Sequence, residues 1–357
     1  MTVEDVEIDQ PRKREVLVDV AASGVCHSDL HFVEGLYDLE AMFGTGPPAI
    51  LGHEGAGVVR EVGPDVTEFQ AGDHVIACLS VFCGKCDFCL TGQTHLCQSP
   101  DVRRGPDEDP KYVWQGQPVT QFANLSTYAE QMLVHENALV KMDDDMPFPQ
   151  AALIGCGVTT GVGAALNTAK VAPGSTVAVF GAGGVGLSVI QGARIAGARR
   201  IIAVDTVESK LATAKELGAT HTVDASSGNP VDKIIELTDG GADYTFEAIG
   251  LKLTAEQAFQ SLKRGGLATV IGMIPVGQMI EIHGVELLSE KKIQGSAMGS
   301  NRFRVDMPKY IDFYRQGRLK LDEMISRTGG LEDINDAFVA MKNGEVARTV
   351  LNIGDHG

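Results

Sequence analysis

Residues Ser175-Thr-Val-Ala-Val-Phe-Gly-Ala-Gly-Gly-Val-Gly186 join a short apolar run to a glycine-rich turn. The run has the composition of a buried strand, and residues 187–197 after it have the pattern of a helix. G-x-G-x-x-G alone is a weak signal, but between a strand and a helix it predicts dinucleotide binding. Its glycines allow a tight turn and close approach of a pyrophosphate, which the helix N-terminus then faces. The expected cofactor-binding residues of this turn are Gly181, Gly183, Gly184, Val185 and Gly186.

The second expected strand, residues 200–205, ends on Asp205, nineteen residues after Gly186. A carboxylate at this position can accept hydrogen bonds from the adenosine ribose and would repel a 2′-phosphate, which favours NAD over NADP. Helices and strands continue to alternate, so we expect a doubly wound parallel sheet. The further helices are expected at residues 208–217, 231–238 and 254–263, and the further strands at 243–247 and 267–272.

Four cysteines lie within fifteen residues, as Cys83-Gly-Lys-Cys86-Asp-Phe-Cys89 and Cys97. Four thiolates on so short a loop can close a tetrahedral shell around Zn²⁺, which is typical of a structural site. An iron–sulfur cluster is the alternative, but its pattern continues with a Cys after three residues and then a Pro, and this chain has neither. Cys78, outside the run, is expected to be a core residue.

A second polar cluster, Cys26-His-Ser-Asp-Leu-His31, directly follows an alternating run that begins at Glu15 and predicts a strand. We expect this cluster to form one short turn at the strand end, facing a cleft. His53 and Glu54 lie between glycines, where the backbone can turn sharply. Taken alone, these residues could equally be core and surface polar groups, and the isolated Cys156 could be a buried structural thiol.

Composition limits the class of protein. The 357 residues are too many for one ordinary domain and suit two. The net charge of −17 argues against nucleic acid or an anionic membrane as a partner. The acidic N-terminus lacks the features of a signal peptide, and the apolar run near residues 176–190 is too short and glycine-rich to span a bilayer. We therefore expect a cytoplasmic location, where the seven cysteines indicate metal chemistry rather than disulfides.

Together the motifs resemble those of the zinc-dependent medium-chain alcohol dehydrogenases, in the branch of the animal-type enzymes and the glutathione-dependent formaldehyde dehydrogenases. The motifs are Cys26-x-Ser-x-x-His31, Gly52-His-Glu-Gly-Ala-Gly57, the four-Cys lobe, Gly155-Cys-Gly157, Gly181-x-Gly-x-x-Gly186 and Ala347-Arg-Thr-Val350. One departure is that members usually carry an additional first strand before the segment equivalent to residues 3–8.

The resemblance implies an α/β protein with a GroES-like β-rich catalytic domain and a Rossmann coenzyme domain. We expect the catalytic domain at residues 1–157, with a zinc lobe near 83–97, and the NAD-binding domain at 158–297. Residues 298–357 would return to the catalytic domain.

The resemblance also implies two zinc ions per chain, one structural in the lobe and one catalytic. Cys26, His53 and Cys156 would hold the catalytic ion and leave one position for water or substrate. Glu54 would lie behind the metal, and Asp29 would orient the imidazole of His53.

Ser28 would accept the proton of the alcohol, which would then pass through the cofactor ribose to His31. By the same resemblance, His27 and Arg348 would face the cofactor phosphates, Lys210 the adenosine ribose, and Thr160 the nicotinamide. Further residues assigned to the cofactor are Ile271, Met273, Ser296 and Met298.

The implied reaction is the reversible oxidation of a small alcohol to an aldehyde or ketone, with a zinc-bound alcohol losing its proton and giving hydride to NAD. A narrower alternative is S-hydroxymethylglutathione as substrate. Relatives with that activity carry an Arg four residues after the last lobe Cys, where this chain has Asp101, with Arg103 and Arg104 nearby. This difference favours an ordinary primary, aryl or terpenoid alcohol.

A different class, a non-catalytic dinucleotide-binding regulator, would not need Ser28 and His31. Relatives pair edge strands of their coenzyme domains, so we expect a homodimer or homotetramer.

Overall fold

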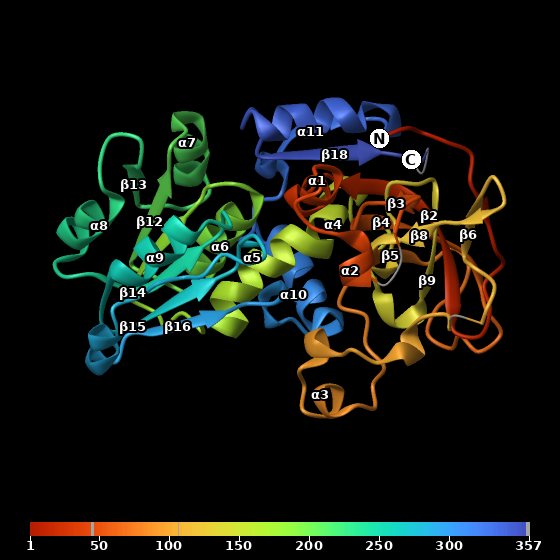
Figure 1. Cartoon of the computed structure of the whole chain (residues 1–357), viewed down its shortest axis with the longest axis horizontal. Helices are drawn as coiled ribbons and strands as arrows, with labels where there is room; N and C mark the ends of the chain where they lie inside the picture. The colour runs from red at the N-terminus through yellow and green to blue at the C-terminus, as the bar shows by residue number, and fades with distance from the viewer. Residues whose placement is uncertain (44–45, 106, 355–357) are drawn as a thin grey trace. The chain divides into compact units, whose positions relative to one another are not determined.

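The computed structural model describes residues 1–43, 46–105 and 107–354. The chain forms two compact units (Figure 1). Unit 1 contains Met1–Cys156, Arg302–Asp312 and Met324–Gly357, and unit 2 contains Gly157–Asn301 and Phe313–Glu323. Residues 298–301 and 313–323 thus group with unit 2, whereas all of residues 298–357 were expected to return to the first domain. The predicted domain boundaries themselves stay a prediction.

Unit 1 is built on a seven-stranded sheet in the order β10-β5-β4-β2-β18-β17, with β9 also paired to β2. β2 forms as predicted, but it is buried on both faces instead of alternating between core and solvent. Val16, Val18 and Val20 are fully buried in one core cluster, and Leu17 on the other face belongs to a second. Because β18 pairs antiparallel with β2, the end of the chain lies beside the strand that leads to Cys26. The strands are β2 Glu15–Gly24, β4 Glu54–Val62, β5 His74–Ala77, β9 Gln131–His135, β10 Leu139–Lys141, β17 Ile325–Gly329 and β18 Arg348–Asn352.

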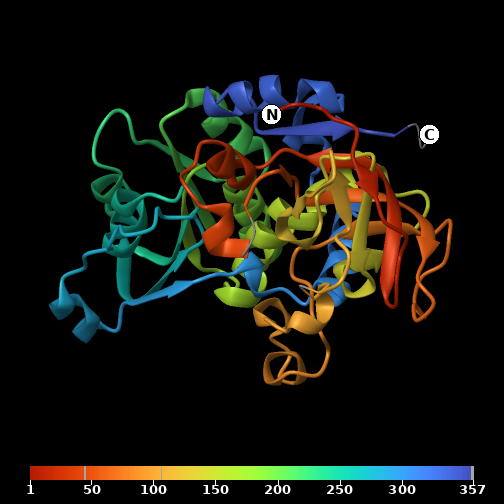
Figure 2. The same cartoon turned by 45° about the vertical axis from the view of Figure 1, so that its right-hand side comes forward.

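Shorter elements complete unit 1. The small strands are β1 Glu7–Ile8, β6 Tyr112–Trp114 and β7 Gln117–Pro118, which form one sheet, and β3 Ala49–Ile50 and β8 Thr120–Gln121, which form another. The helices are α1 His27–Val33, α2 Leu39–Phe43, α3 Asp87–Leu90, α4 Phe148–Leu153 and α11 Ile334–Lys342, and α10 Phe303–Arg315 is shared with unit 2. The segment around α3 is the orange loop at the bottom of Figures 1 and 2.

Unit 2 is the predicted doubly wound fold. Its six strands are all parallel, in the order β13-β12-β11-β14-β15-β16. The strands are β11 Thr176–Phe180, β12 Arg200–Asp205, β13 His221–Asp224, β14 Ala242–Glu247, β15 Leu262–Val270 and β16 Lys292–Gly295. The helices are α5 Thr159–Gly163, α6 Gly184–Ile195, α7 Glu208–Glu216, α8 Pro230–Thr238 and α9 Lys252–Gln260. The predicted β-rich unit and the predicted doubly wound parallel sheet are confirmed, whereas the edge strands β13 and β16 were not predicted.

A helical stretch of 21 residues, Phe148–Thr168, connects the two units in sequence. Among the described residues it is the one helix long and apolar enough to cross a membrane, by length and composition alone. However, 83% of its most apolar window is buried within the protein, as in the core helix of a globular fold. It contains two π-helical turns, η5 Ile154–Val158 and η6 Ala164–Thr168, and η5 carries Cys156.

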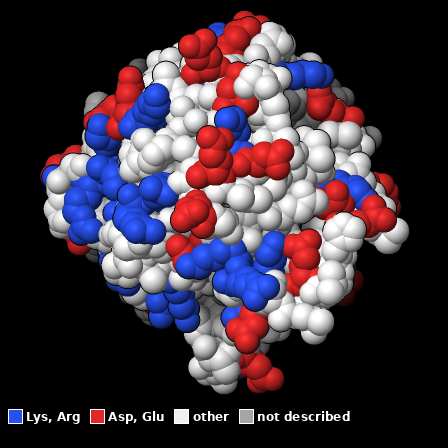
Figure 3. Space-filling model, turned by 90° about the vertical axis from the view of Figure 1, so that its left-hand side faces the viewer, with Lys and Arg blue, Asp and Glu red and all other residues white. Residues whose placement is uncertain are grey.

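Charges of both signs occur on the face drawn in Figure 3. Lys and Arg side chains form several groups there, between groups of Asp and Glu, although the whole chain has a net charge of −17. Acidic and basic side chains on this face therefore form separate groups.

Candidate active site and metal centres

Four buried side chains converge in unit 1. Cys26, His53, Glu54 and Cys156 each offer a ligand atom, and these atoms all lie within 4.8 Å of one another. Cys26 lies between β2 and α1, His53 directly precedes β4, Glu54 begins that strand, and Cys156 lies in the π-helical turn η5. π-helical turns are frequent at functional sites. Residues 26, 53 and 156, which the resemblance implied as zinc ligands, are thus brought together.

The cluster after β2 forms a helix, α1 His27–Val33, rather than the single turn expected from the sequence. The helix begins directly after Cys26, so it buries Asp29 and leaves His27 exposed. Ser28 lies beside the metal ligand, with its Oγ 3.8 Å from the Cys26 Sγ. The rings of His27 and His31 lie edge to face, 6.3 Å apart.

The imidazole of His53 is held from behind by Asp29. Its Nδ1 donates to Asp29 Oδ1 at 3.2 Å, which directs Nε2 toward the cysteines. The same carboxylate accepts the Gly52 N–H at 2.9 Å and the Tyr128 hydroxyl at 3.0 Å. Gly52 has a φ of +90°, and a Cβ there would lie 2.6 Å from Tyr128, so this turn requires glycine.

Behind the cluster, Glu54 forms a buried ion pair with Arg348. Gly24 leaves the space for this pair, since a Cβ there would strike the Glu54 carboxylate. Arg348, expected at the cofactor phosphates, is therefore engaged by Glu54 in this structure.

Electrostatics favour a thiolate at Cys26. Its pKa is held well below the usual value by a hydrogen bond from Cys156 and by the nearby His53 and Arg348, although burial opposes this. Burial alone would lower the pKa of His53, but Asp29 and the Cys26 thiolate raise this pKa to about 10. A metal ion that binds His53 must therefore displace a proton.

The four lobe cysteines form the second metal-ligating group among the described residues. The Sγ atoms of Cys86 and Cys89 are 3.5 Å apart, those of Cys86 and Cys97 3.8 Å, and those of Cys83 and Cys89 3.9 Å. The Lys85 N–H bonds the Cys83 sulfur, and with the Cys86 N–H it lowers the pKa of Cys83 to about 6 against the effect of desolvation. Cys78 is buried, belongs to neither group, and has a pKa raised to about 12 by that burial.

In unit 2 the glycine-rich turn has the geometry of a phosphate-binding loop. Gly181 has a φ of +95°, and a Cβ on Gly186 would collide with its carbonyl oxygen, so both positions require glycine. Gly183 faces open space, with no described heavy atom within 4 Å of the place of a Cβ. Asp205 ends β12, and its carboxylate accepts the N–H groups of Ala182 at 2.8 Å and Thr206 at 2.8 Å.

The other expected cofactor residues of unit 2 lie in two groups. Ile271 and Met273 follow the carboxyl end of β15, where the Ile271 N–H bonds the Glu247 carbonyl at 2.8 Å. The Thr160 hydroxyl contacts the Met298 sulfur at 3.2 Å, and the Ser296 hydroxyl lies 2.9 Å from that of Thr168. Lys210 is in the first turns of α7, close in sequence to Asp205. Their roles toward the cofactor, with that of His27, stay predictions.

Comparison with known proteins agrees with this architecture. Residues 12–144 match the alcohol dehydrogenase GroES-like domain, and residues 184–316 match the zinc-binding dehydrogenase domain. An S-(hydroxymethyl)glutathione dehydrogenase of Photobacterium damsela subsp. piscicida is 41% identical, over 99% of this chain and 96% of that protein. The chain belongs to the zinc-dependent medium-chain alcohol dehydrogenases.

Other members of the family are similar over the same extent. A class-3 alcohol dehydrogenase of Cereibacter sphaeroides is 40% identical, over 98% of this chain and 96% of that protein. The benzyl alcohol dehydrogenase of Acinetobacter calcoaceticus has a structure with a TM-score of 0.89 and 36% identity, covering 98% of this chain and 94% of that one. This alcohol dehydrogenase is thus an oxidoreductase of the class-3 branch that uses zinc and NAD.

The donor atoms of this alcohol dehydrogenase fit the two zinc ions of its family. A tetrahedral zinc site with Zn–S bonds of about 2.3 Å needs ligand atoms about 3.8 Å apart. The Sγ separations of 3.5 to 3.9 Å in the lobe match this value. In the catalytic cluster, two thiols and one imidazole lie close enough to share one ion, and Glu54 offers a further oxygen. The open side of Gly183 likewise leaves room for a pyrophosphate.

Two contacts of the site carry no signal in the sequence. The hydroxyl of Tyr128 bonds Asp29, and Arg348 pairs with Glu54. Both contacts join residues about a hundred or more positions apart, for which a single sequence gives no signal. The predicted role of Arg348 toward the cofactor phosphates stays a prediction.

Proposed function

We propose that this protein oxidises a primary or aryl alcohol to the aldehyde, reversibly, with hydride transfer to NAD. The observation that carries the proposal is the buried convergence of Cys26, His53 and Cys156, with Ser28 directly beside Cys26. Bound zinc would act there as a Lewis acid that makes the alcohol hydroxyl more acidic.

The chain's own residues would handle the proton and the hydride acceptor. Ser28 Oγ would accept the alcohol proton, and His31, one helical turn further along α1, would pass it to solvent. Asp29 would keep His53 in the tautomer that offers Nε2 to the metal. The Gly181–Gly186 turn and Asp205 would hold the pyrophosphate and ribose of NAD.

The position of Asp101 favours an ordinary alcohol over S-hydroxymethylglutathione. Glutathione carries two carboxylates, and a site for it gains from a cationic side chain. Four residues after the last lobe cysteine, where relatives with that activity carry an Arg, this chain has Asp101, which is paired with Lys85 at 2.5 Å. Arg104 is engaged by Asp9 at 2.6 Å and by Glu15 at 2.6 Å.

S-Hydroxymethylglutathione is the second candidate, because the relative at 41% identity is an S-(hydroxymethyl)glutathione dehydrogenase. A screen of the zinc-loaded protein against benzyl alcohol, short primary alcohols and hydroxymethylglutathione, with NAD and with NADP, separates the two. We expect about two zinc ions per chain, NADH formation, and a higher kcat/KM for benzyl alcohol. A higher kcat/KM for the glutathione adduct would overturn the substrate assignment, and zinc-free protein or no NADH formation would overturn the activity.

We also propose a homodimer or homotetramer located in the cytoplasm. Support for self-association comes from unit 2, where β16 is an edge strand and the segment before it carries exposed apolar side chains. Support for the cytoplasm comes from the metal-ligand spacing of six of the seven cysteines, since free thiolates persist in a reducing compartment.

A further inference from the structure

The turn that carries His53 is clamped by residues 126–128. Three donors of this segment form hydrogen bonds to three consecutive carbonyl oxygens of the turn. Ser126 Oγ donates to the Ile50 carbonyl at 2.8 Å, the Thr127 N–H to the Gly52 carbonyl at 3.0 Å, and the Tyr128 N–H to the Leu51 carbonyl at 3.0 Å. Ser126, Thr127 and Tyr128 are all buried. The backbone next to His53 is therefore fixed by a segment about seventy-five residues further along the chain.

Tyr128 reaches further than its neighbours. Its hydroxyl donates to Asp29 Oδ2 at 3.0 Å, while Asp29 Oδ1 accepts from His53 Nδ1 at 3.2 Å. Asp29 is fully buried, so no solvent replaces a lost donor. One oxygen of the carboxylate thus accepts from the Tyr128 hydroxyl, and the other accepts from the His53 imidazole.

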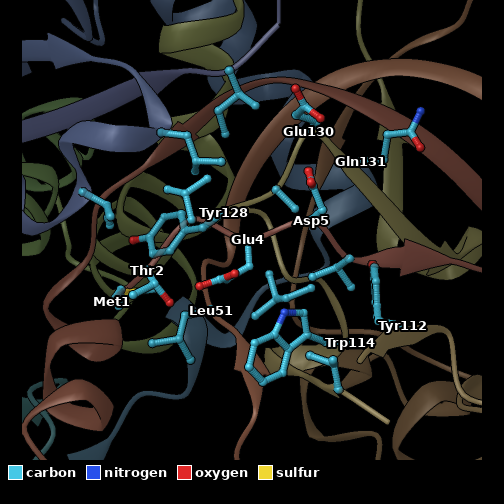
Figure 4. A pocket seen from close by; sticks show the side chains of 18 of the residues that line it. Met1, Thr2, Glu4, Asp5, Leu51, Tyr112, Trp114, Tyr128, Glu130 and Gln131 are labelled. Carbon is cyan, nitrogen blue, oxygen red and sulfur yellow. The ribbon is translucent and has the colours of Figure 1, made fainter. Parts of the chain in front are cut away.

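The Tyr128 side chain is buried, and it borders a cavity of about 490 Å³ in unit 1, which Trp114 and Tyr112 also line. Figure 4 shows Tyr128 at the margin of this cavity, with its hydroxyl directed away from Trp114. The ring contacts Phe338 edge to face at 6.4 Å. Because a cavity leaves room beside the ring, we infer that its hydrogen bond to Asp29 helps to fix its position.

We propose that Tyr128 is a positioning residue for the catalytic metal, acting through Asp29 on the ligand His53. The inference rests on the proposed zinc chemistry of the Cys26, His53 and Cys156 cluster. Loss of the hydroxyl would leave Asp29 with one donor fewer and would let the imidazole turn away from the cysteines. Partners of this kind alter metal affinity by about ten- to a hundredfold.

The test compares Tyr128→Phe with Tyr112→Phe. Tyr112 is a matched control, because it is buried, lines the same cavity, and has a hydroxyl that accepts the Leu133 N–H at 2.9 Å. Zinc release to a chromogenic chelator is followed for both variants and for the unmodified protein. We expect release from the catalytic site to be about tenfold faster in Tyr128→Phe, and release from the lobe to be unchanged. In Tyr112→Phe both rates should stay near those of the unmodified protein.

A spectroscopic measurement separates positioning from loss of stability. With Co²⁺ in the catalytic site, Tyr128→Phe should shift the visible bands, and Tyr112→Phe should leave them unchanged. Equal release rates and equal spectra in the two variants would overturn the role of Tyr128 and leave the proposed function standing. An unmodified protein that binds no zinc at Cys26 would overturn both.

A second variant keeps the inference testable if Tyr128→Phe does not fold. Phe338→Leu removes the ring contact of Tyr128 but keeps its hydroxyl. It should speed zinc release from the catalytic site by less than about tenfold. An increase of about tenfold or more, with the hydroxyl still present, would contradict the positioning role of the hydroxyl.

Discussion

At the scale of single residues, Asp205 is the group that should decide between the two nicotinamide cofactors. Its carboxylate lies at the end of β12 and accepts the N–H groups of Ala182 and Thr206, which keeps its charge at the mouth of the glycine-rich turn. Asp205→Asn retains one acceptor oxygen and removes the charge. We expect the ratio of kcat/KM for NADP to that for NAD to rise by about tenfold, or about 1.4 kcal/mol, measured by initial rates.

Asp224 provides the control for this prediction. It ends the neighbouring strand β13 and accepts the Ser226 N–H at 2.8 Å, so Asp224→Asn makes the same chemical change one strand away. The cofactor ratio should not move in that variant. A ratio that stays constant in Asp205→Asn as well would remove Asp205 from cofactor selection.

Single residues also show where sequence analysis reaches its limit. The lobe ligands Cys83, Cys86, Cys89 and Cys97 could be recognised from local spacing, because a short loop places them around one point without help from the fold. Cys156 could not be recognised in this way, since its neighbours Cys26 and His53 are more than a hundred positions away, and its role came from the family resemblance. Tyr128 gave no signal at all, because a tyrosine beside a strand is usually a core residue.

At the scale of elements, the lobe depends on its metal. The helix α3 buries none of its residues, and its Phe88 and Leu90 side chains are 43% and 72% exposed. A segment without an apolar core of its own is held together by its metal ligands. Cys97→Ser should therefore reduce the zinc content from about two ions per chain to one and open the lobe to limited proteolysis, with metal analysis and peptide mapping as the measurements.

Cys78→Ala is the companion variant for the lobe. Cys78 is fully buried outside both metal clusters, so its loss should cost about 1 kcal/mol of stability and leave both zinc ions in place. Two ions per chain in Cys97→Ser would show that the lobe site does not need this ligand.

Elements were predictable where a local pattern was strong. The strands β11, β12, β14 and β15 were expected because they carry apolar runs between turn signals. The edge strands β13 and β16 are four residues long, with one buried side chain in β13 and none in β16, so neither shows an apolar period. The expected turn at residues 26–31 became α1, because its helix buries Asp29 and Leu30 against the rest of unit 1.

At the scale of the whole molecule, the exposed surface near β16 bears on the number of subunits. Val276, Met279 and Leu288 are 86%, 76% and 86% exposed in the segment that leads to this strand. The strand pairs with β15 on one side, and its other edge is the end of the sheet. Large apolar side chains beside an unpaired strand edge are typical of a surface that another chain covers.

We therefore expect light scattering to give a mass of at least twice the 37.9 kDa of one chain. Leu288→Glu should shift the protein toward the monomer, because a carboxylate would be buried without a partner in the interface. Ile235→Glu is the matched change, since Ile235 is 40% exposed on α8, which follows the strand β13 at the opposite edge of the sheet. If Ile235→Glu dissociates the protein and Leu288→Glu does not, the contact between copies lies at the β13 edge instead.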